Sequence, residues 1–106
     1  MARVRFEWDP GKDRVNQAKR GVPFELAQYA FADPSRVLAE DLSHGTREQR
    51  YSCFGRVSDA ILTVRFTYRK GAIRIFGAGY WRKGKRIYEQ ARQIHRGADR
   101  KGPRRS

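Results

Sequence analysis

Arginines are the side chains of this sequence with the clearest chemical use, because several of them alternate with apolar residues in one segment. Over residues 60–69 the apolar side chains stand at every second position, and the positions between them hold Thr63, Arg65, Thr67 and Arg69. A period of two is typical of a β-strand that buries one face. The arginines would then share the other face of a sheet, where their planar guanidinium groups suit phosphate or carboxylate.

A tight turn after this strand would add another arginine to the same face. Lys70-Gly71 is typical of a two-residue hairpin turn, and residues 73–76 are predicted to form the returning strand. With that turn, the facing pairs are Arg69 with Ala72, Tyr68 with Ile73, Thr67 with Arg74, and Phe66 with Ile75. This register matches apolar with apolar side chains, whereas a slip of one residue destroys the match. Because neighbouring like charges repel, the grouping of Arg65, Arg69 and Arg74 predicts an anion between them.

Proton transfer requires other residue types, and the candidates are His44, Glu48, Glu89 and Tyr88. His44 has the most suitable unperturbed pKa, about 6.5. It lies in a predicted loop over residues 42–46, where capping of a turn fits it equally well. Glu48 can instead pair with a nearby arginine, and Tyr88 falls in the apolar stripe of a predicted helix, as a core residue would.

No metal site and no cofactor are expected. The two histidines are far apart in the sequence and Cys53 is the single cysteine, so no ligand cluster of the usual spacing is present. Gly77-Ala78-Gly79 leads from a strand into a basic helix but lacks the rest of a nucleotide-binding fingerprint. Cys53 falls in a strand-like run, where a small core residue is the expected role rather than a nucleophile.

The net charge of +13 is unevenly distributed and indicates a polyanionic partner. Residues 1–64 carry ten Lys and Arg against nine Asp and Glu, whereas residues 65–106 carry fourteen against two. A nucleic acid is therefore expected to contact the C-terminal half of the chain. A basic surface kept only for solubility, or a ribosomal or membrane-surface role, fits the charge as well.

The chain of 106 residues has the length of one domain, and 39% hydrophobic residues suffice for one core. The predicted strands cover residues 3–8, 36–40, 50–57, 60–69 and 73–76, and the predicted helices cover 10–20, 23–32 and a segment from about residue 80. Asp9 is expected to cap the first helix and Gly21 to end it. We thus expect an α+β fold in which an N-terminal helical hairpin packs on an antiparallel sheet, with a C-terminal helix.

Two further expectations concern domain boundaries and location. Residues 1–95 are predicted to form the domain, and residues 96–106, rich in Gly, Pro and Arg, a disordered basic tail. The N-terminus lacks the apolar run of a signal peptide, and no stretch approaches the ~20 apolar residues of a membrane span. With a single cysteine, the sequence is expected to be that of a cytoplasmic protein with no membrane contact.

A series of short motifs runs in order from about residue 5 to residue 90. Its members are Phe6-Glu7-Trp8-Asp9-Pro10, Lys12, Asn16, Lys19, Gly21-Val22, Phe24-Glu25, Ala27, Phe31, Asp33-Pro34, Asp41, His44, Glu48, Arg50, Gly55-Arg56, Thr67, Arg69, Ile73-Arg74-Ile75, Arg86, Tyr88 and Glu89. This ordered series resembles the BrnT toxins of bacterial BrnT/BrnA toxin–antitoxin pairs, whose fold is similar to that of RelE-type ribonucleases. The resemblance implies an endoribonuclease that acts on cellular RNA. It also implies a BrnA-like antitoxin partner with a ribbon-helix-helix DNA-binding domain, and contact with operator DNA only through that complex.

Three positions differ from the usual pattern of the family. Arg20 stands where a His is usual, and Lys85 replaces a Glu near the start of the final helix. The last strand usually ends in Ser-Ala-Arg, whereas here Gly77-Ala78-Gly79 supplies no arginine. Arg82 or Arg86 are candidates to neutralise the scissile phosphate in its place. The departures leave open a second hypothesis, in which the chain is a catalytically degenerate module that binds nucleic acid or antitoxin.

RNA cleavage without a metal needs a base for the 2′-OH proton, cations for the pentavalent phosphorane and an acid for the leaving oxygen. Arginine can fill only the second of these roles. The predicted catalytic residues are Arg50, Arg69, Arg74, His44 and Glu48. The predicted RNA-binding residues are Arg65, Arg82, Lys83, Lys85 and Arg86. Docking of RNA, without stabilisation of the phosphorane, is the alternative role for the three catalytic arginines.

Overall fold

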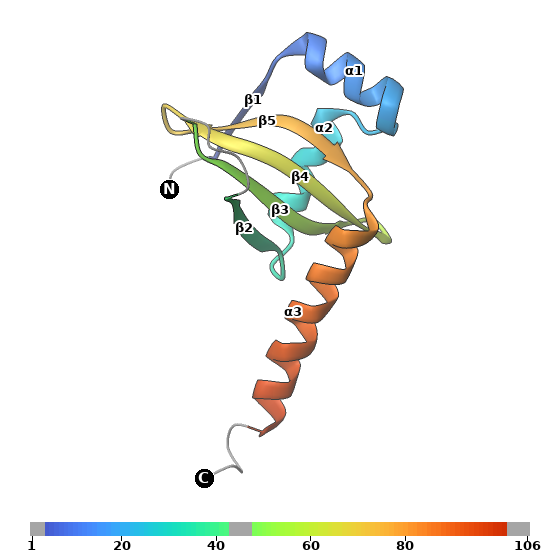
Figure 1. The fold of residues 1–106 in the computed structure, drawn as a ribbon, viewed down its shortest axis with the longest axis vertical. Coiled ribbons are helices and arrows are strands. Elements are labelled where there is room, and N and C mark those ends of the chain that lie inside the picture. Colours follow the sequence, from blue (N-terminus) through green and yellow to red (C-terminus); the bar gives the residue numbers. More distant parts are fainter. Residues whose placement is uncertain (1–3, 43–47, 102–106) are drawn as a thin grey trace.

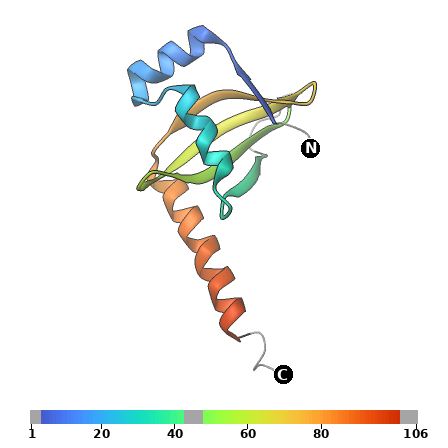
Figure 2. The same cartoon turned by 180° about the vertical axis from the view of Figure 1, so that it is seen from behind.

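The computed structural model describes the backbone of residues 4–42 and 48–101, and side chains as far as residue 93. Within these ranges a five-stranded sheet carries helical segments on both faces (Figures 1 and 2). In chain order the elements are β1 (Arg5–Trp8), α1 (Pro10–Arg20), α2 (Phe24–Ala27), the 3-10 helix η1 (Gln28–Ala32), β2 (Val37–Asp41), β3 (Arg50–Val57), β4 (Ala60–Arg69), β5 (Ala72–Gly79) and α3 (Arg82–Lys101). The α+β class is therefore confirmed.

The sheet has the strand order β1-β5-β4-β3-β2 and is mixed, not antiparallel as the sequence analysis predicts. Strands β2 to β5 pair antiparallel in chain order, but β1 pairs with β5 in parallel, with Phe6 beside Ile73 and Trp8 beside Ile75. After β1 the chain forms the N-terminal helices and rejoins the sheet at the opposite edge, so β1 fills the free edge of β5. An alternating pattern identifies a strand but does not specify its direction or its neighbour.

The hairpin of β4 and β5 has the predicted register next to its turn. Arg69 faces Ala72, Thr67 faces Arg74 and Phe66 faces Ile75. Lys70 and Gly71 have φ angles of 50° and 79°, as the mirror-image turns of tight hairpins require. Beyond this stretch the pairing shifts, because Arg65 faces Gly77 and leaves Phe76 as an extra residue in β5. This β-bulge is not evident from the alternation of side chains.

Helix α1 begins and ends as predicted. The Asp9 carboxylate accepts a hydrogen bond of 2.9 Å from the Lys12 N–H, and Gly21 closes the helix with a φ of 72°. Asn16 fixes this helix to the sheet, because its amide nitrogen donates to the carbonyl oxygens of Val22 and Ala78 over 2.9 and 3.0 Å. The helix is thereby held against the end of β5.

The second helix differs from the single helix predicted over residues 23–32. It consists of one α-helical turn, α2, followed by the 3-10 helix η1. Figure 2 shows both crossing one face of the sheet, and α1 contacts β5. The predicted αα-hairpin is therefore not confirmed, since these short segments bury their apolar residues against the sheet.

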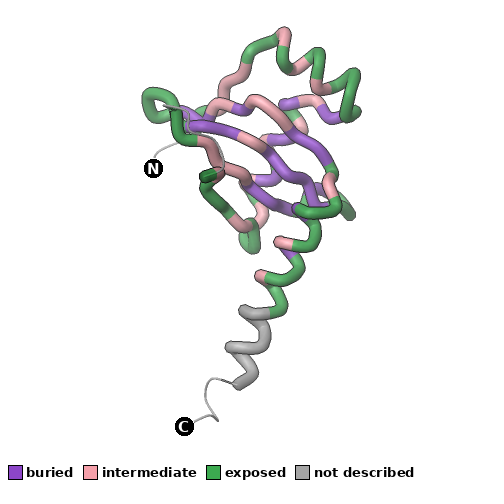
Figure 3. The backbone as a smooth tube through the Cα atoms, in the orientation of Figure 1, coloured by how far each residue is buried: buried purple, intermediate pink, exposed green. Residues whose placement is uncertain are grey.

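The core lies between α2, η1 and this face of the sheet, which we call the covered face. Its fully buried side chains include Val22, Phe24, Ala27, Ala30, Cys53, Leu62, Val64, Phe66, Ile75 and Ala78. Figure 3 shows the buried positions concentrated along β3, β4 and β5. The apolar positions that the sequence pattern assigns to the inner face of β4 are buried, except that Tyr68 is half exposed at the strand end.

Helix α3 starts on the opposite face of the sheet, which we call the open face, and then extends away from it (Figure 1). Its first turn lies close to the strands because residue 84 is glycine: a Cβ there would collide with the Thr63 hydroxyl and the Phe54 ring. Tyr88, buried on this helix, donates a hydrogen bond of 2.7 Å to Asp33. The helix continues to Lys101, so the predicted boundary at residue 96 falls within α3.

None of the helices in the described part of the chain is both long and apolar enough to cross a membrane.

Candidate active site

Four of the predicted catalytic residues line a single hollow of about 200 Å³ on the open face: Glu48, Arg50, Arg69 and Arg74. The hollow is also lined by Asp9, Lys12, Thr67, Ile75 and Phe76. The arginines come from β3, β4 and β5, which are adjacent in the sheet. Residues 43–47 are not described, so the predicted catalytic residue His44 lies outside the described residues.

The strand register brings the three arginines to the same hollow. Arg74 on β5 faces Thr67, two residues before Arg69 on β4, and Arg50 on β3 precedes Tyr51, which faces Phe66 on β4. Arg74 also forms an ion pair of 3.1 Å with Glu7 on β1, and each side chain is about one third exposed, at 30% and 33%. A substrate phosphate in the hollow would therefore share Arg74 with a carboxylate already in place.

Phe76 organises two further cation contacts. The guanidinium carbons of Arg50 and Arg65 lie 4.9 and 5.2 Å from the centre of its ring. Such distances fall in the range of cation–π attraction. Phe76 is the extra residue of the β-bulge, and bulges redirect side chains next to the site they occupy. Phe76 was not among the predicted site residues, although its alternation with Ile75 assigns it to the face of Arg74.

A short hydrogen bond fixes the segment that enters the hollow ahead of β3. The Thr67 hydroxyl donates to the carbonyl oxygen of Gln49 over 2.6 Å. The Gln49 side chain in turn donates to Glu40 over 3.0 Å and accepts from the Tyr51 hydroxyl over 2.9 Å. Gln49 stands between Glu48 and Arg50, so these bonds set the backbone from which both side chains extend.

Of the proton-transfer candidates within the described residues, the hollow contains Glu48 alone. Tyr88 is buried and its hydroxyl donates a hydrogen bond to Asp33, which confirms the core interpretation. Glu89 lines a different hollow, together with Arg56 and Lys85. Asp9, which the sequence analysis assigns to a helix cap, contributes a second carboxylate to the hollow while still capping α1.

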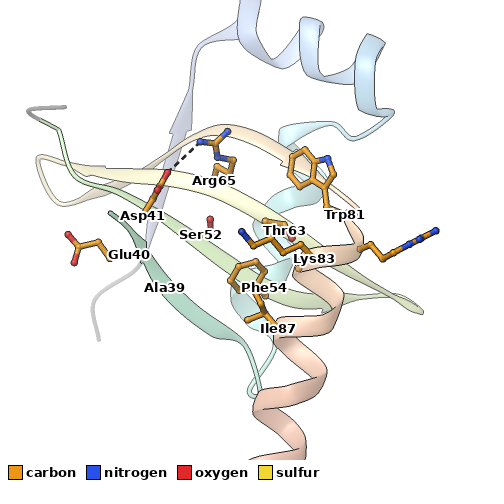
Figure 4. A pocket seen from close by; sticks show the side chains of 12 residues that line it. Ala39, Glu40, Asp41, Ser52, Phe54, Thr63, Arg65, Trp81, Lys83 and Ile87 are labelled. Atoms are coloured by element: carbon orange, nitrogen blue, oxygen red, sulfur yellow. Dashed lines mark ion pairs between the residues drawn. The ribbon is translucent and has the colours of Figure 1, made fainter. Parts of the chain in front are cut away.

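The predicted RNA-binding residues are divided among separate places. Arg65, Arg82 and Lys83 line a groove of about 610 Å³ between the sheet and the first turns of α3 (Figure 4). Arg65 forms an ion pair of 3.7 Å with Asp41 at one side of this groove. Lys85 and Arg82 border the hollow of Glu89, and Arg86 is exposed on α3.

Two of the three departures from the usual family pattern are brought together by Trp81. Its ring lies against Gly79, where an added Cβ would come within 2.9–3.0 Å of the indole carbons. The guanidinium carbon of Arg20 lies 4.9 Å from the centre of the same ring. Trp81 directly precedes Arg82, the first residue of α3. The space that a larger side chain at residue 79 would need is therefore filled by Trp81.

Two groups with shifted pKa values lie outside the hollow. Cys53 is fully buried, which confirms it as a core residue, and burial raises the pKa of its thiol to about 12. Burial would also raise the pKa of Asp33, but hydrogen bonds from the Arg56 N–H, the Tyr88 hydroxyl and the Ser35 N–H together lower it. Asp33 is thus a charged anchor that joins η1, β3 and α3.

Among the described side chains, no group of three or more His, Cys, Asp and Glu is arranged to hold a metal ion. The positive charge in the hollow comes from arginine and lysine.

Comparison with known families assigns the chain. A family model described as "Ribonuclease toxin, BrnT, of type II toxin-antitoxin system" matches residues 8–84, which is well over half of the chain. The chain therefore belongs to the BrnT family of ribonuclease toxins, as the ordered motifs predict. The matched range contains the hollow and the start of α3. No curated protein matches the sequence.

Proposed function

We propose that this BrnT family member is a metal-independent endoribonuclease that cleaves cellular RNA in the cytoplasm, inhibits translation, and is neutralised by a BrnA-like antitoxin. The observation that carries the proposal is the hollow on the open face, where three arginines from three adjacent strands surround a space that a phosphate can enter. The family supplies the general activity, and the hollow supplies the chemistry that this activity needs.

In the proposed reaction, the 2′-OH of a nucleotide attacks the adjacent phosphorus, and the 5′-oxygen of the next nucleotide leaves. The phosphorane that forms between these steps carries more negative charge than the substrate. Arg50, Arg69 and Arg74 would bind its oxygens, and such preorganised donors lower the barrier because the charge develops where they already point. Since arginine provides this charge, the mechanism requires no metal ion.

Proton transfer is assigned to a carboxylate and a histidine. Glu48 lines the same hollow as the three arginines and is proposed to accept the 2′-OH proton. His44, four residues earlier in the chain, is the proposed acid for the leaving oxygen on the basis of its residue type. Asp9 is a second carboxylate at the hollow, but its hydrogen bond from Lys12 assigns it to helix capping.

The antitoxin belongs to the proposal because type II systems pair a toxin with a protein inhibitor. We propose that the partner carries a ribbon-helix-helix domain and that operator DNA is bound only through the complex. Covering the hollow would suffice for inhibition, since the arginines would no longer be accessible to RNA.

One observation favours a second candidate function. The family usually has an arginine at the position of Gly79, and here Trp81 fills the space beside that glycine. The end of β5 therefore supplies no cation. If cleavage requires that cation, this chain would bind nucleic acid or antitoxin without cleaving RNA. Two cations border this junction: Arg82 is the first residue of α3, and Arg20 lies over the Trp81 ring.

Cleavage by the purified chain separates the two functions. The chain, with a chelator present, is incubated with a structured cellular RNA, alongside Arg69→Ala and a control, Arg14→Ala, which removes an exposed arginine of α1 that lines neither the hollow nor the groove. We expect the native chain and the control to cleave and Arg69→Ala to lose cleavage. A folded native chain that leaves RNA intact at every concentration would support the non-cleaving module.

A further inference from the structure

The groove between the open face and α3 has a composition that phosphate binding does not explain. Its walls include three apolar side chains, Phe54, Trp81 and Ile87, beside three cations, Arg65, Arg82 and Lys83. Figure 4 shows Arg65 to the left and Trp81 to the right in the upper part of the view, with Thr63, Lys83 and Phe54 below them. A site that binds phosphate alone needs cations and N–H donors, whereas apolar walls suit a flat, weakly polar group such as a nucleobase.

Trp81 is held in place by the ends of three elements. Its ring packs on Gly79 at the end of β5, its carbonyl oxygen accepts the Lys85 N–H of α3 over 3.1 Å, and Arg20 at the end of α1 lies over the ring. An aromatic ring that is positioned before a ligand arrives binds at a lower entropic cost. Trp81 is only partly buried, so part of its surface faces the groove.

One cation–π contact links a side chain of the groove to a side chain of the hollow. Arg65 lines the groove, and its guanidinium carbon lies 5.2 Å from the Phe76 ring, which lines the hollow. Arg50 of the hollow contacts the same ring. An RNA strand with one phosphate in the hollow therefore has a positively charged path past Phe76 into the groove.

From these observations we infer that the groove is a subsite for the base of a nucleotide neighbouring the scissile phosphate, with Trp81 as its stacking surface. The inference rests on the proposed function and names the substrate class as single-stranded RNA, because a base stacked inside a duplex cannot enter a groove between a helix and a sheet. Arg82 and Lys83, exposed at the groove edge, contact the phosphate of that nucleotide.

An acidic segment of a protein is the competing occupant, and the charges on the groove disfavour it. Asp41 lines the wall formed by β2 and points toward Arg65, whereas Glu40 points away from the groove (Figure 4), so an acidic peptide would meet the Asp41 carboxylate there. The Asp41 carboxylate oxygens can also accept hydrogen bonds from the amino groups of a base. The composition thus fits a ligand that combines a negative backbone with an apolar, hydrogen-bonding ring.

Tryptophan fluorescence tests the inference directly, since the chain contains only Trp8 and Trp81. A Trp8→Phe variant, which retains an aromatic ring against Phe24, reports on Trp81 alone. The probe is a short 2′-O-methyl oligoribonucleotide, which lacks the attacking hydroxyl, and the matched control is inorganic polyphosphate, which has the charge without bases. We expect saturable quenching of Trp81 by the oligonucleotide and none by polyphosphate. Equal quenching by both, or binding of the oligonucleotide without a change in emission, would overturn the inference.

A kinetic measurement gives an independent result. Stacking of one base contributes enough that its loss weakens binding by about tenfold or more. We therefore expect Trp81→Leu to raise the KM for RNA about tenfold with little change in kcat, and Trp81→Phe to restore most of the loss. An unchanged KM for a folded Trp81→Leu would contradict the subsite.

The two proposals fail separately. If the oligonucleotide quenches Trp81 but the native chain does not cleave RNA, the base-binding groove is supported and the ribonuclease activity is excluded. If the chain cleaves RNA but Trp81 is not quenched, the ribonuclease activity is supported and the subsite is excluded. Arg69→Ala in the Trp8→Phe background should lose cleavage and keep the quenching. Quenching by an acidic peptide but not by the oligonucleotide would assign the groove to a protein partner and overturn the inference.

Discussion

The two faces of the sheet differ in function, although the same strands form both: one face packs into the core and the other carries the candidate site. The covered face buries side chains such as Phe66 and Val64 beneath α2 and η1, and its contacts are apolar. The open face, formed by the alternate residues of the same strands, carries Arg50, Arg69 and Arg74 around the hollow and Arg65 in the groove. Because adjacent side chains on a strand point in opposite directions, one β4 sequence supplies both the core and the site.

Because the core and the candidate site lie on different faces, we expect that stability and activity can be altered separately in this molecule. A change on the covered face should act through folding, and a change on the open face should act on RNA with little effect on folding. Asp33 is the exception, since it joins η1 on one side to Tyr88 of α3 on the other.

The largest expected effect belongs to the covered face. Phe66→Ala removes a ring that is 1% exposed and that packs on Phe31 and Tyr51 at centroid distances of 5.0 and 5.6 Å. We expect a loss of about 3–5 kcal/mol in the free energy of unfolding, from lost burial and the cavity left behind. Denaturant unfolding measures it. A loss below about 1 kcal/mol would show that this face is not the core.

The next effect belongs to the open face. Arg74→Ala should lower kcat for RNA by about 10²–10³-fold, which is typical for the loss of one preorganised donor to a developing oxyanion. Thermal unfolding should change little, because Arg74 is partly exposed and its ion pair with Glu7 contributes little to stability. Single-turnover cleavage assays provide the rates. If activity drops only in proportion to unfolded protein, the separation of the faces is wrong.

The contribution of Asp33 to the free energy of unfolding should depend on pH. Its pKa is lowered in the folded chain, so its charge stabilises the fold above the unfolded pKa of about 3.9, and the contribution disappears as the pH falls through the lowered folded value. Asp33→Asn should cost about 1–2 kcal/mol near pH 7. The difference between native and variant should shrink below about pH 4 in unfolding experiments at several pH values. A difference that is independent of pH would assign the effect to packing.

Phe76 should act on the site without forming the core. Phe76→Leu keeps an apolar side chain in the bulge but removes the ring that Arg50 and Arg65 contact. We expect kcat to fall about tenfold as the arginines lose their orientation. Phe76→Tyr should restore most of the rate. Equal rates for the leucine and tyrosine variants would exclude a role for the ring.

Substitution of Glu7 should have the smallest effect, and it should strengthen RNA binding instead of weakening activity. Removing its charge with Glu7→Gln frees Arg74 from an ion pair of 3.1 Å, so Arg74 becomes more available to phosphate. Binding of a non-cleavable 2′-O-methyl oligoribonucleotide should strengthen by about two- to fivefold, the size of a partly exposed ion pair. Weaker binding would mean that Glu7 holds Arg74 in its active position.

Local patterns predicted much of this molecule. The turn at Lys70-Gly71, the caps of α1 and the register of Thr67 with Arg74 are each set by a few neighbouring residues, and each is confirmed. The grouping of Arg69 and Arg74 followed from that register. These features were predictable because two strands joined by a short loop have little choice of alignment.

Contacts between distant segments were not predictable. The parallel pairing of β1 with β5, the bulge at Phe76 and the seat of Trp81 on Gly79 depend on how the whole chain closes. Gly84 has no Cβ and therefore allows α3 to approach Thr63 closely. The residues next to Gly84 in the sequence do not reveal this contact, because Thr63 belongs to a distant segment.

The most direct test of the central claim is the chemistry of the RNA ends that the full chain produces in the presence of a chelator. If the arginines of the open face stabilise attack by the 2′-OH, the products must carry 2′,3′-cyclic phosphates. The double variant Arg69→Ala, Arg74→Ala, with the unfolding midpoint of the native chain, must form none above background. Cyclic phosphate ends formed at an undiminished rate by that folded variant would contradict the claim that the open face is the catalytic face.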